Sequence, residues 1–113
     1  MENLLNETIE FLKEHNLSES DVRWVGCIDF KTSWENFKDV ANKEYSSDYR
    51  WQEVASDLLV VGDNWWLERW EYDGSEGWSF KKFPKEPQKT VRLKHVISNS
   101  CGWKDLKEMN LLI

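Results

Sequence analysis

The chain has 113 residues, of which 40% are hydrophobic and 32% are charged, and its formal net charge is −6. These values exclude an intrinsically disordered chain and fit one domain, over residues 1–113, that folds without metal or disulfide. Its apolar runs are all much shorter than the ~20 residues that cross a bilayer, so we expect no contact with a membrane.

The first helix is predicted near the N-terminus. Apolar residues recur there at the three- and four-residue spacing of one helix face, over residues 3–15. Asn16 follows, and asparagine tolerates the left-handed conformation that closes many helices. The stretch has no positively charged start ahead of an apolar run, so we expect no signal peptide. Because the two cysteines, Cys27 and Cys101, lie far apart, we expect a reducing, cytoplasmic setting.

A strand and a second helix follow. The run VRWVGCIDF is rich in β-branched and aromatic residues and predicts a strand over residues 22–30. Thr32 and Glu35 match the T-x-x-E capping box, in which each side chain binds the backbone amide of the other residue. An apolar face behind this box predicts a helix over residues 33–44. We also expect a short helix over residues 49–56.

The middle of the chain changes to a β pattern. Three runs of β-type residues predict strands at 57–61, 65–72 and 77–83. The residues Gly62–Asn64 and the pair Asp73–Gly74 separate these runs, and they tolerate the positive φ angles of tight turns. The three strands are therefore expected to form an antiparallel meander.

The C-terminal third is less regular. Residues 90–97, TVRLKHVI, alternate weakly and fit either a fourth strand or a helix, while residues 102–110 predict a short helix. The whole pattern predicts an α+β fold: an antiparallel meander sheet of three to five strands, with helices packed mainly on one face.

The predicted strand 65–72 raises the question of a binding surface. Alternation places Trp65, Leu67 and Arg69 on one face and Trp66, Trp70 and Tyr72 on the other. A thin sheet covered on one face leaves some of these rings near solvent, where aromatic residues often anchor partners. The alternative is that they only form core. The residues that we expect to contact a partner are Trp66, Glu68, Trp70, Tyr72, Asp73, Glu76 and Trp78.

Motifs for catalysis are missing. The sequence has no Gly-rich phosphate loop, no G-x-S-x-G and no H-E-x-x-H, so we expect a non-enzymatic protein without a cofactor. The histidines and cysteines are isolated from one another, so we expect no metal site. The best enzymatic alternative is a small carbohydrate-active module whose carboxylates would be Glu68, Glu71, Asp73 and Glu76.

Charge bears on the kind of partner. Residues 1–80 carry 18 acids and 7 bases, whereas residues 81–113 carry 3 acids and 8 bases. Aromatic sheets that stack nucleic-acid bases need a positive groove, and this hairpin is acidic, so we do not expect direct nucleic-acid binding. The acids around the tryptophans favour a basic or arginine-bearing protein instead.

The block VVGDNWWLERWEYDGSEGWSFKKFPKEP adds a resemblance. Its G-D-x-W-W-L-E-R, E-Y-D-G-S-E and P-x-x-P elements resemble a family of small uncharacterised proteins from phages and prophages of Gram-positive bacteria. With the upstream SWENFKDVANKEY, the resemblance covers roughly residues 33–87. It implies a virus-derived, cytoplasmic accessory protein without catalytic precedent. By analogy with other small acidic phage proteins, we expect it to bind a host or viral protein and inhibit host machinery. A structural or assembly role with an aromatic core stays an alternative.

Overall fold

The computed structural model describes residues 2–46, 52–98 and 102–111. The chain groups into two compact units, Met1–Phe83 and Pro84–Ile113. The first unit contains most of the regular structure, and the second contains one short helix in its described part. A single domain over the whole chain stays a prediction.

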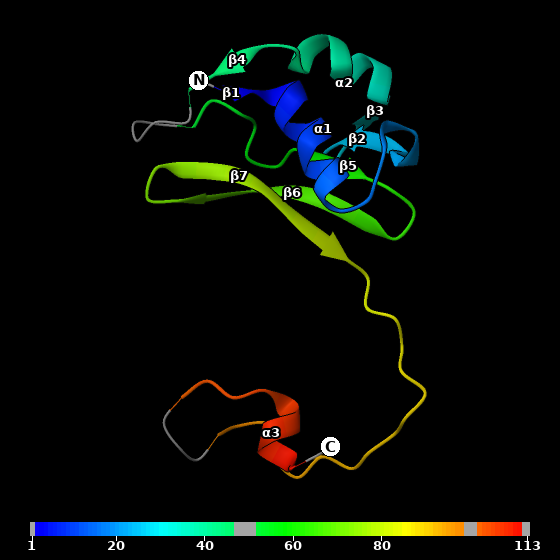
Figure 1. Ribbon diagram of the computed structural model, residues 1–113, viewed down its shortest axis with the longest axis vertical. Helices are drawn as coiled ribbons and strands as arrows, with labels where there is room; N and C mark the ends of the chain where they lie inside the picture. Colours follow the sequence, from blue (N-terminus) through cyan, green and yellow to red (C-terminus); the bar gives the residue numbers. More distant parts are fainter. Residues whose placement is uncertain (1, 47–51, 99–101, 112–113) are drawn as a thin grey trace. The chain divides into compact units, whose positions relative to one another are not determined.

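The first unit is built around an antiparallel sheet (Figure 1). Its strands are β2 (Trp24–Gly26), β3 (Lys31–Thr32), β5 (Leu59–Val61), β6 (Trp65–Tyr72) and β7 (Ser75–Lys82), in the order β3-β2-β5-β6-β7. The last three follow one another as a meander. The predicted α+β class with a sheet of three to five antiparallel strands is therefore confirmed.

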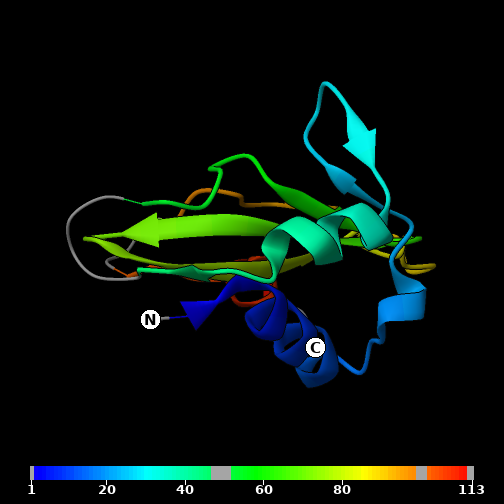
Figure 2. The same ribbon diagram turned by 90° about the horizontal axis from the view of Figure 1, so that it is seen from above.

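Two helices cover one face of this sheet, α1 (Leu4–Glu14) and α2 (Trp34–Ala41) (Figures 1 and 2). The Asn3 side chain begins α1 by accepting a hydrogen bond from the Asn6 amide, and Asn16 closes it with a φ of 59°. The predicted first helix and its end are confirmed. Because the helices pack on one side, the sheet has an inner face toward them and an outer face away from them.

The start of α2 differs from the prediction by one residue. Ser33 begins the helix, because its hydroxyl accepts a hydrogen bond of 3.1 Å from the Asn36 amide. Thr32 instead belongs to β3, where it pairs with Val25, and its hydroxyl donates to the Asn36 side chain. The capping box of Thr32 with Glu35 is therefore wrong, since the chain leaves the strand only at Ser33.

The predicted strand 22–30 is interrupted by a turn. Only Trp24–Gly26 form β2, and the Cys27 amide then donates to the Phe30 carbonyl, which turns the chain into β3. Gly26 permits this turn, because a Cβ there would lie 2.2 Å from the Phe30 oxygen.

The helix predicted over residues 49–56 is wrong for its described part. Residues 52–56 are irregular, and residues 49–51 lie outside the described residues.

The main core lies between the helices and the inner face of the sheet. Inner-face positions of β2, β5, β6 and β7 meet the apolar sides of α1 and α2 there. Burial of this apolar surface is the main favourable term in folding. The buried residues of this cluster are Leu12, Val25, Phe37, Ala41, Val60, Trp65, Leu67 and Trp78.

The N-terminus is tied to the chain just after α2. The two-residue strand β1 (Glu2–Asn3) pairs antiparallel with β4 (Glu44–Tyr45). This pairing holds the start of α1 beside the end of α2, and the Asn3 and Asn42 side chains are hydrogen-bonded there. It also buries Tyr45, which becomes part of a charged cluster described below.

The second unit contains α3 (Leu106–Asn110), which confirms the predicted C-terminal helix. Its Asn110 side chain accepts hydrogen bonds from the amides of Lys94 and His95 and donates one to the His95 carbonyl. Residues 90–97 are neither strand nor helix, so both alternatives for that segment are wrong. In the described part of the chain, no helix is long and apolar enough to cross a membrane.

Candidate functional site

The β6–β7 hairpin carries the residues that the sequence singles out. Asp73 and Gly74 form its two-residue turn with φ angles of 49° and 87°, as the Asp-Gly pair predicts. The strand predicted at 65–72 is β6, and the one predicted at 77–83 begins two residues earlier as β7. Side chains alternate as expected, and the outer face of β6 bears Trp66, Glu68, Trp70 and Tyr72.

Aromatic side chains are exposed on this outer face. Tyr72 is 79% exposed, Trp70 is 43% exposed, and Phe83, just after β7, is 65% exposed. Trp66 is partly buried because its ring packs on that of Phe83, with centroids 5.1 Å apart. The expectation of more aromatic surface than one covered face can hide therefore agrees with the structure at these positions.

An apolar groove lies next to these rings. Its volume is about 580 Å³, within the range of about 300–1,000 Å³ that is typical of ligand sites. The strand register places Val61 opposite both Trp66 and Trp24, so three strands contribute to one surface. Its apolar lining includes Trp24, Ile28, Leu59, Val61, Trp66 and Phe83. We call these six residues, with Trp70 and Tyr72, the outer aromatic surface.

Charges around the groove are largely balanced. Asp63 pairs with Arg23 at 2.7 Å, and Glu68 lies 3.9 Å from the ammonium of Lys81. Both pairs are solvent-exposed and contribute little to stability. In the described part of the chain, the groove walls therefore show no surplus of positive charge along the strands.

The contribution of β2 and β5 to this surface could not be predicted from the hairpin sequence alone. Trp24 lies about 40 residues before Trp66 in the chain. Only the pairing of β2 with β5, and of β5 with β6, brings them into one surface. Alternation along each strand was the one available signal, and it does not specify which strands are neighbours.

Trp78 is a correction to the predicted contact residues. It is 4% exposed and lies on the inner face, where its indole N–H donates to the Thr8 hydroxyl at 2.9 Å. Glu76 also lies on the inner face, and its side chain is 3% exposed. These two residues are therefore not part of the exposed surface, because they alternate with the outer-face positions of β7.

Glu76 belongs to a buried charged cluster centred on Arg69. The Arg69 side chain is 4% exposed, and its guanidinium lies 2.8 Å from Glu76, 3.3 Å from Glu7 and 3.3 Å from the Tyr45 hydroxyl. It also lies over the Trp78 ring, 4.8 Å from the ring centroid. One signal for this cluster is present in the sequence, an arginine at an inner-face position of β6.

The cluster shifts two pKa values. Burial, together with the hydrogen bond that the Tyr45 hydroxyl donates to Glu7, raises the pKa of Tyr45 to about 12. Burial alone would lower the pKa of Arg69, but its hydrogen bonds to Tyr45 and Glu76 outweigh this effect and raise that pKa. Arg69 therefore stays charged and links α1, β4 and the hairpin.

The carboxylates of the alternative carbohydrate-active module lie on different faces of the hairpin. Glu68 points to the outer face and Glu71 to the inner face, so they cannot flank one substrate bond. Glu76 is buried against Arg69, while Asp73 is exposed at the turn. Among the described residues, no group of three or more metal-binding side chains lies together.

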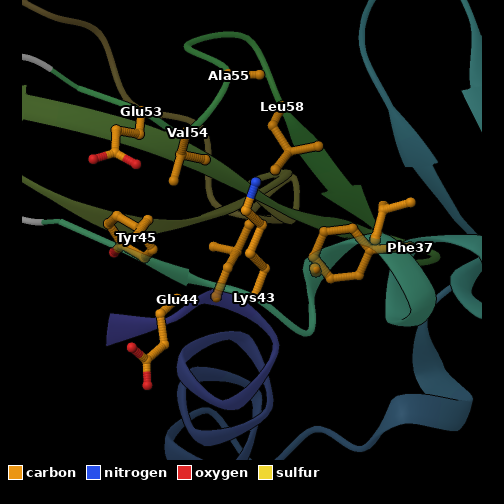
Figure 3. Close-up of a pocket in the computed structure, with 11 residues that line it drawn as sticks. Phe37, Lys43, Glu44, Tyr45, Glu53, Val54, Ala55 and Leu58 are labelled. Carbon is orange, nitrogen blue, oxygen red and sulfur yellow. The ribbon is translucent and has the colours of Figure 1, made fainter. Parts of the chain in front are cut away.

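A second apolar pocket lies on the other side of the hairpin, beside α2 and β4 (Figure 3). Phe37, Tyr45, Val54 and Leu58 supply much of its wall, and Lys43 also lines it. Its volume of about 260 Å³ is less than half that of the groove. The outer aromatic surface is therefore the better candidate for contact with a macromolecule.

Comparison with known proteins adds no further assignment, since no family model, no curated protein and no solved structure matches this chain.

Proposed function

We propose that the protein is a non-enzymatic accessory protein of phage or prophage type that binds a host or viral protein through the outer aromatic surface. In this proposal it acts in the cytoplasm and inhibits host machinery by occupying a surface of its partner. The phage assignment rests on the sequence resemblance, and the binding role rests on physical features of the hairpin.

The observation that supports binding is the exposed aromatic side chains beside a groove of about 580 Å³. Exposing Tyr72, Trp70 and Phe83 to water together is unfavourable for a free protein, and apolar patches of this kind commonly mark protein contacts. Tyrosine and tryptophan are also the residues that most often dominate interface energies.

The test starts with capture of partners from a lysate of a Gram-positive host, using the full chain as bait. A captured protein is then purified and titrated against the wild type and against Trp66→Ala/Tyr72→Ala. We expect the double variant to weaken binding by at least tenfold, because each aromatic anchor typically contributes more than 1 kcal/mol.

A matched control distinguishes specific binding through this surface from non-specific binding by exposed apolar residues. Val40 is an exposed apolar residue of α2, on the helix side of the sheet, so Val40→Ala should leave the affinity unchanged. Equal affinities for the wild type and a folded Trp66→Ala/Tyr72→Ala variant would reject the surface as the contact site. They would favour an aromatic core without a docking role.

A further inference from the structure

A small polar pocket lies at the turn end of the hairpin, next to the groove, with which it shares Ser56 and Arg69. It has a volume of about 280 Å³ and is lined by Gln52, Val54, Ser56, Arg69, Trp70, Glu71 and Glu76. Gln52 also reaches the turn, where its amide donates to the Gly74 carbonyl. The pocket therefore lies between segment 52–56 and β6, next to the N-terminal end of β5.

Two carboxylates face each other across the hairpin at this pocket. Glu71 and Glu76 are directly opposite partners in the antiparallel register, so they lie on the same face. Like charges in this position destabilise a hairpin unless a cation compensates them. Glu71 is exposed and accepts a hydrogen bond of 3.0 Å from the Gly74 amide, whereas Glu76 is buried.

The compensation that Arg69 provides is incomplete. Among the described residues, Arg69 is the only basic one that lines the pocket, and it pairs with Glu7 as well as Glu76, so two carboxylates share its single charge. Within the described residues, the Oε2 atom of Glu76 has no hydrogen-bond partner, although its side chain is 97% buried. A buried carboxylate oxygen without a partner is costly, and a further cation would lower that cost.

We propose that this pocket takes an arginine side chain of the protein partner, as an anchor beside the outer aromatic surface. This inference rests on the proposed function. A guanidinium suits the pocket because its planar set of N–H donors can serve two neighbouring carboxylates. The exposed Glu71 supplies the direct contact, and the buried side chain of Glu76, whose Oε2 atom has no partner among the described residues, adds negative charge at the wall.

Size and ligand chemistry argue for one side chain over other cations. The pocket is just below the range of small-molecule sites, which begins at about 300 Å³, so it fits a single side chain. No group of three or more metal-binding side chains occurs in residues 2–46, 52–98 and 102–111, so a metal ion lacks a ligand set there.

The test uses the ¹⁵N-labelled full chain and Nα-acetyl-arginine amide as the probe. Nα-acetyl-citrulline amide is the matched control, because it has the same shape without the charge. We expect arginine to shift the amide signals of Glu71, Gly74 and Glu76 in a saturable way, and citrulline to leave them in place. Raising the ionic strength should weaken the arginine effect.

Two variants locate the effect. Glu71→Gln keeps an oxygen for the Gly74 amide but removes the contacting charge, so arginine should bind about tenfold more weakly. Glu68→Gln changes the net charge equally on the outer face and should leave arginine binding unchanged. An unchanged arginine affinity in folded Glu71→Gln would overturn the assignment.

The outcomes also separate this inference from the proposed function. Absence of a saturable arginine shift in the folded wild type, or an equal response to citrulline, would reject the pocket as an arginine site. The outer aromatic surface would still stand if Trp66→Ala/Tyr72→Ala lost the captured partner. Loss of the partner in folded Glu71→Gln, with partner binding retained in folded Trp66→Ala/Tyr72→Ala, would instead place the contact in the pocket alone.

Discussion

The indole N–H of Trp70 donates a hydrogen bond of 3.1 Å to the backbone carbonyl of Trp78, across the neighbouring strand. The ring reaches that oxygen by lying over Gly77, its direct partner in the register. One tryptophan of the hairpin is thus held on the outer face by the backbone of another whose side chain is in the core. Gly77 leaves room for this ring, because a side chain there would crowd it.

Replacement of Gly77 tests this relationship directly. A Cβ at position 77 would lie 3.1 Å from the Trp70 ring, so Gly77→Ala should push the indole outward and weaken its hydrogen bond. We expect the free energy of unfolding to fall by about 1–3 kcal/mol, measured by urea denaturation. Ser79→Ala, on the same face of β7, should change it by less than about 0.5 kcal/mol. Equal denaturation midpoints for the two variants would refute the steric argument.

The contact of Thr8 with Trp78 is a second test, this time in the core. Thr8→Val keeps the shape but removes the oxygen that accepts from the Trp78 indole, which leaves a buried N–H without a partner. We expect a loss of about 1–3 kcal/mol in the free energy of unfolding. In the Trp78→Phe background the same substitution should cost clearly less, because no N–H is left unpaired. Equal costs in both backgrounds would show that the bond contributes nothing.

Removal of the Arg69 charge should have a larger effect. Arg69→Met leaves the buried Glu76 carboxylate without a counter-charge, which typically costs about 3–5 kcal/mol. The double variant Arg69→Met/Glu76→Leu removes both charges and should regain much of that loss. Thermal unfolding by circular dichroism would measure both variants, and a double variant no more stable than Arg69→Met would contradict this account.

The raised pKa of Tyr45 predicts an alkaline loss of stability. The tyrosine pKa is about 12 in the folded state and 10.0 by reference, so the folded state holds its proton more tightly. This contribution is fully present below pH 10 and is lost as the pH rises through about 12. Over that window it amounts to at most about 2.7 kcal/mol, since each pKa unit corresponds to about 1.4 kcal/mol. Tyr45→Phe should flatten this part of the pH–stability curve, and an unchanged slope would argue against the shift.

Fluorescence quenching tests the exposure of the outer aromatic surface. Trp103 of the second unit is fully exposed, so the comparison starts from a Trp103→Phe background. There, Trp70→Phe should lower the fraction of emission that acrylamide quenches, because this ring is 43% exposed. Trp65→Phe removes a buried ring and should raise the same fraction. The reverse order would contradict the assignment of faces.

Local patterns in the sequence predicted the hairpin well. The Asp73–Gly74 turn and the alternation along β6 depend on neighbouring residues, and both agree with the structure. The helix 3–15 was predictable for the same reason, because its apolar face repeats within a short window. The candidate outer-face residues of β6 follow from that alternation alone.

Features that depend on distant residues were not predictable in the same way. Thr32 matches a capping pattern, but its pairing with Val25 keeps it in a strand. The residues next to Thr32 in the sequence do not predict this pairing. Trp78 is of a residue type that is common at interfaces, and only its contact with α1 shows that it belongs to the core. Arg69 contacts Glu7 and Tyr45 only in the tertiary structure, so the charged cluster could not be predicted from the hairpin sequence.

The bonds between α1 and the hairpin also constrain the order of folding. Glu7 and Arg69 are 62 positions apart, and Thr8 and Trp78 are 70 apart, so both contacts close very long loops. Contacts of such high sequence separation slow folding, because chain entropy is lost before they form. During synthesis, the polar contacts of α1 with the hairpin can therefore form only after nearly the whole first unit has left the ribosome.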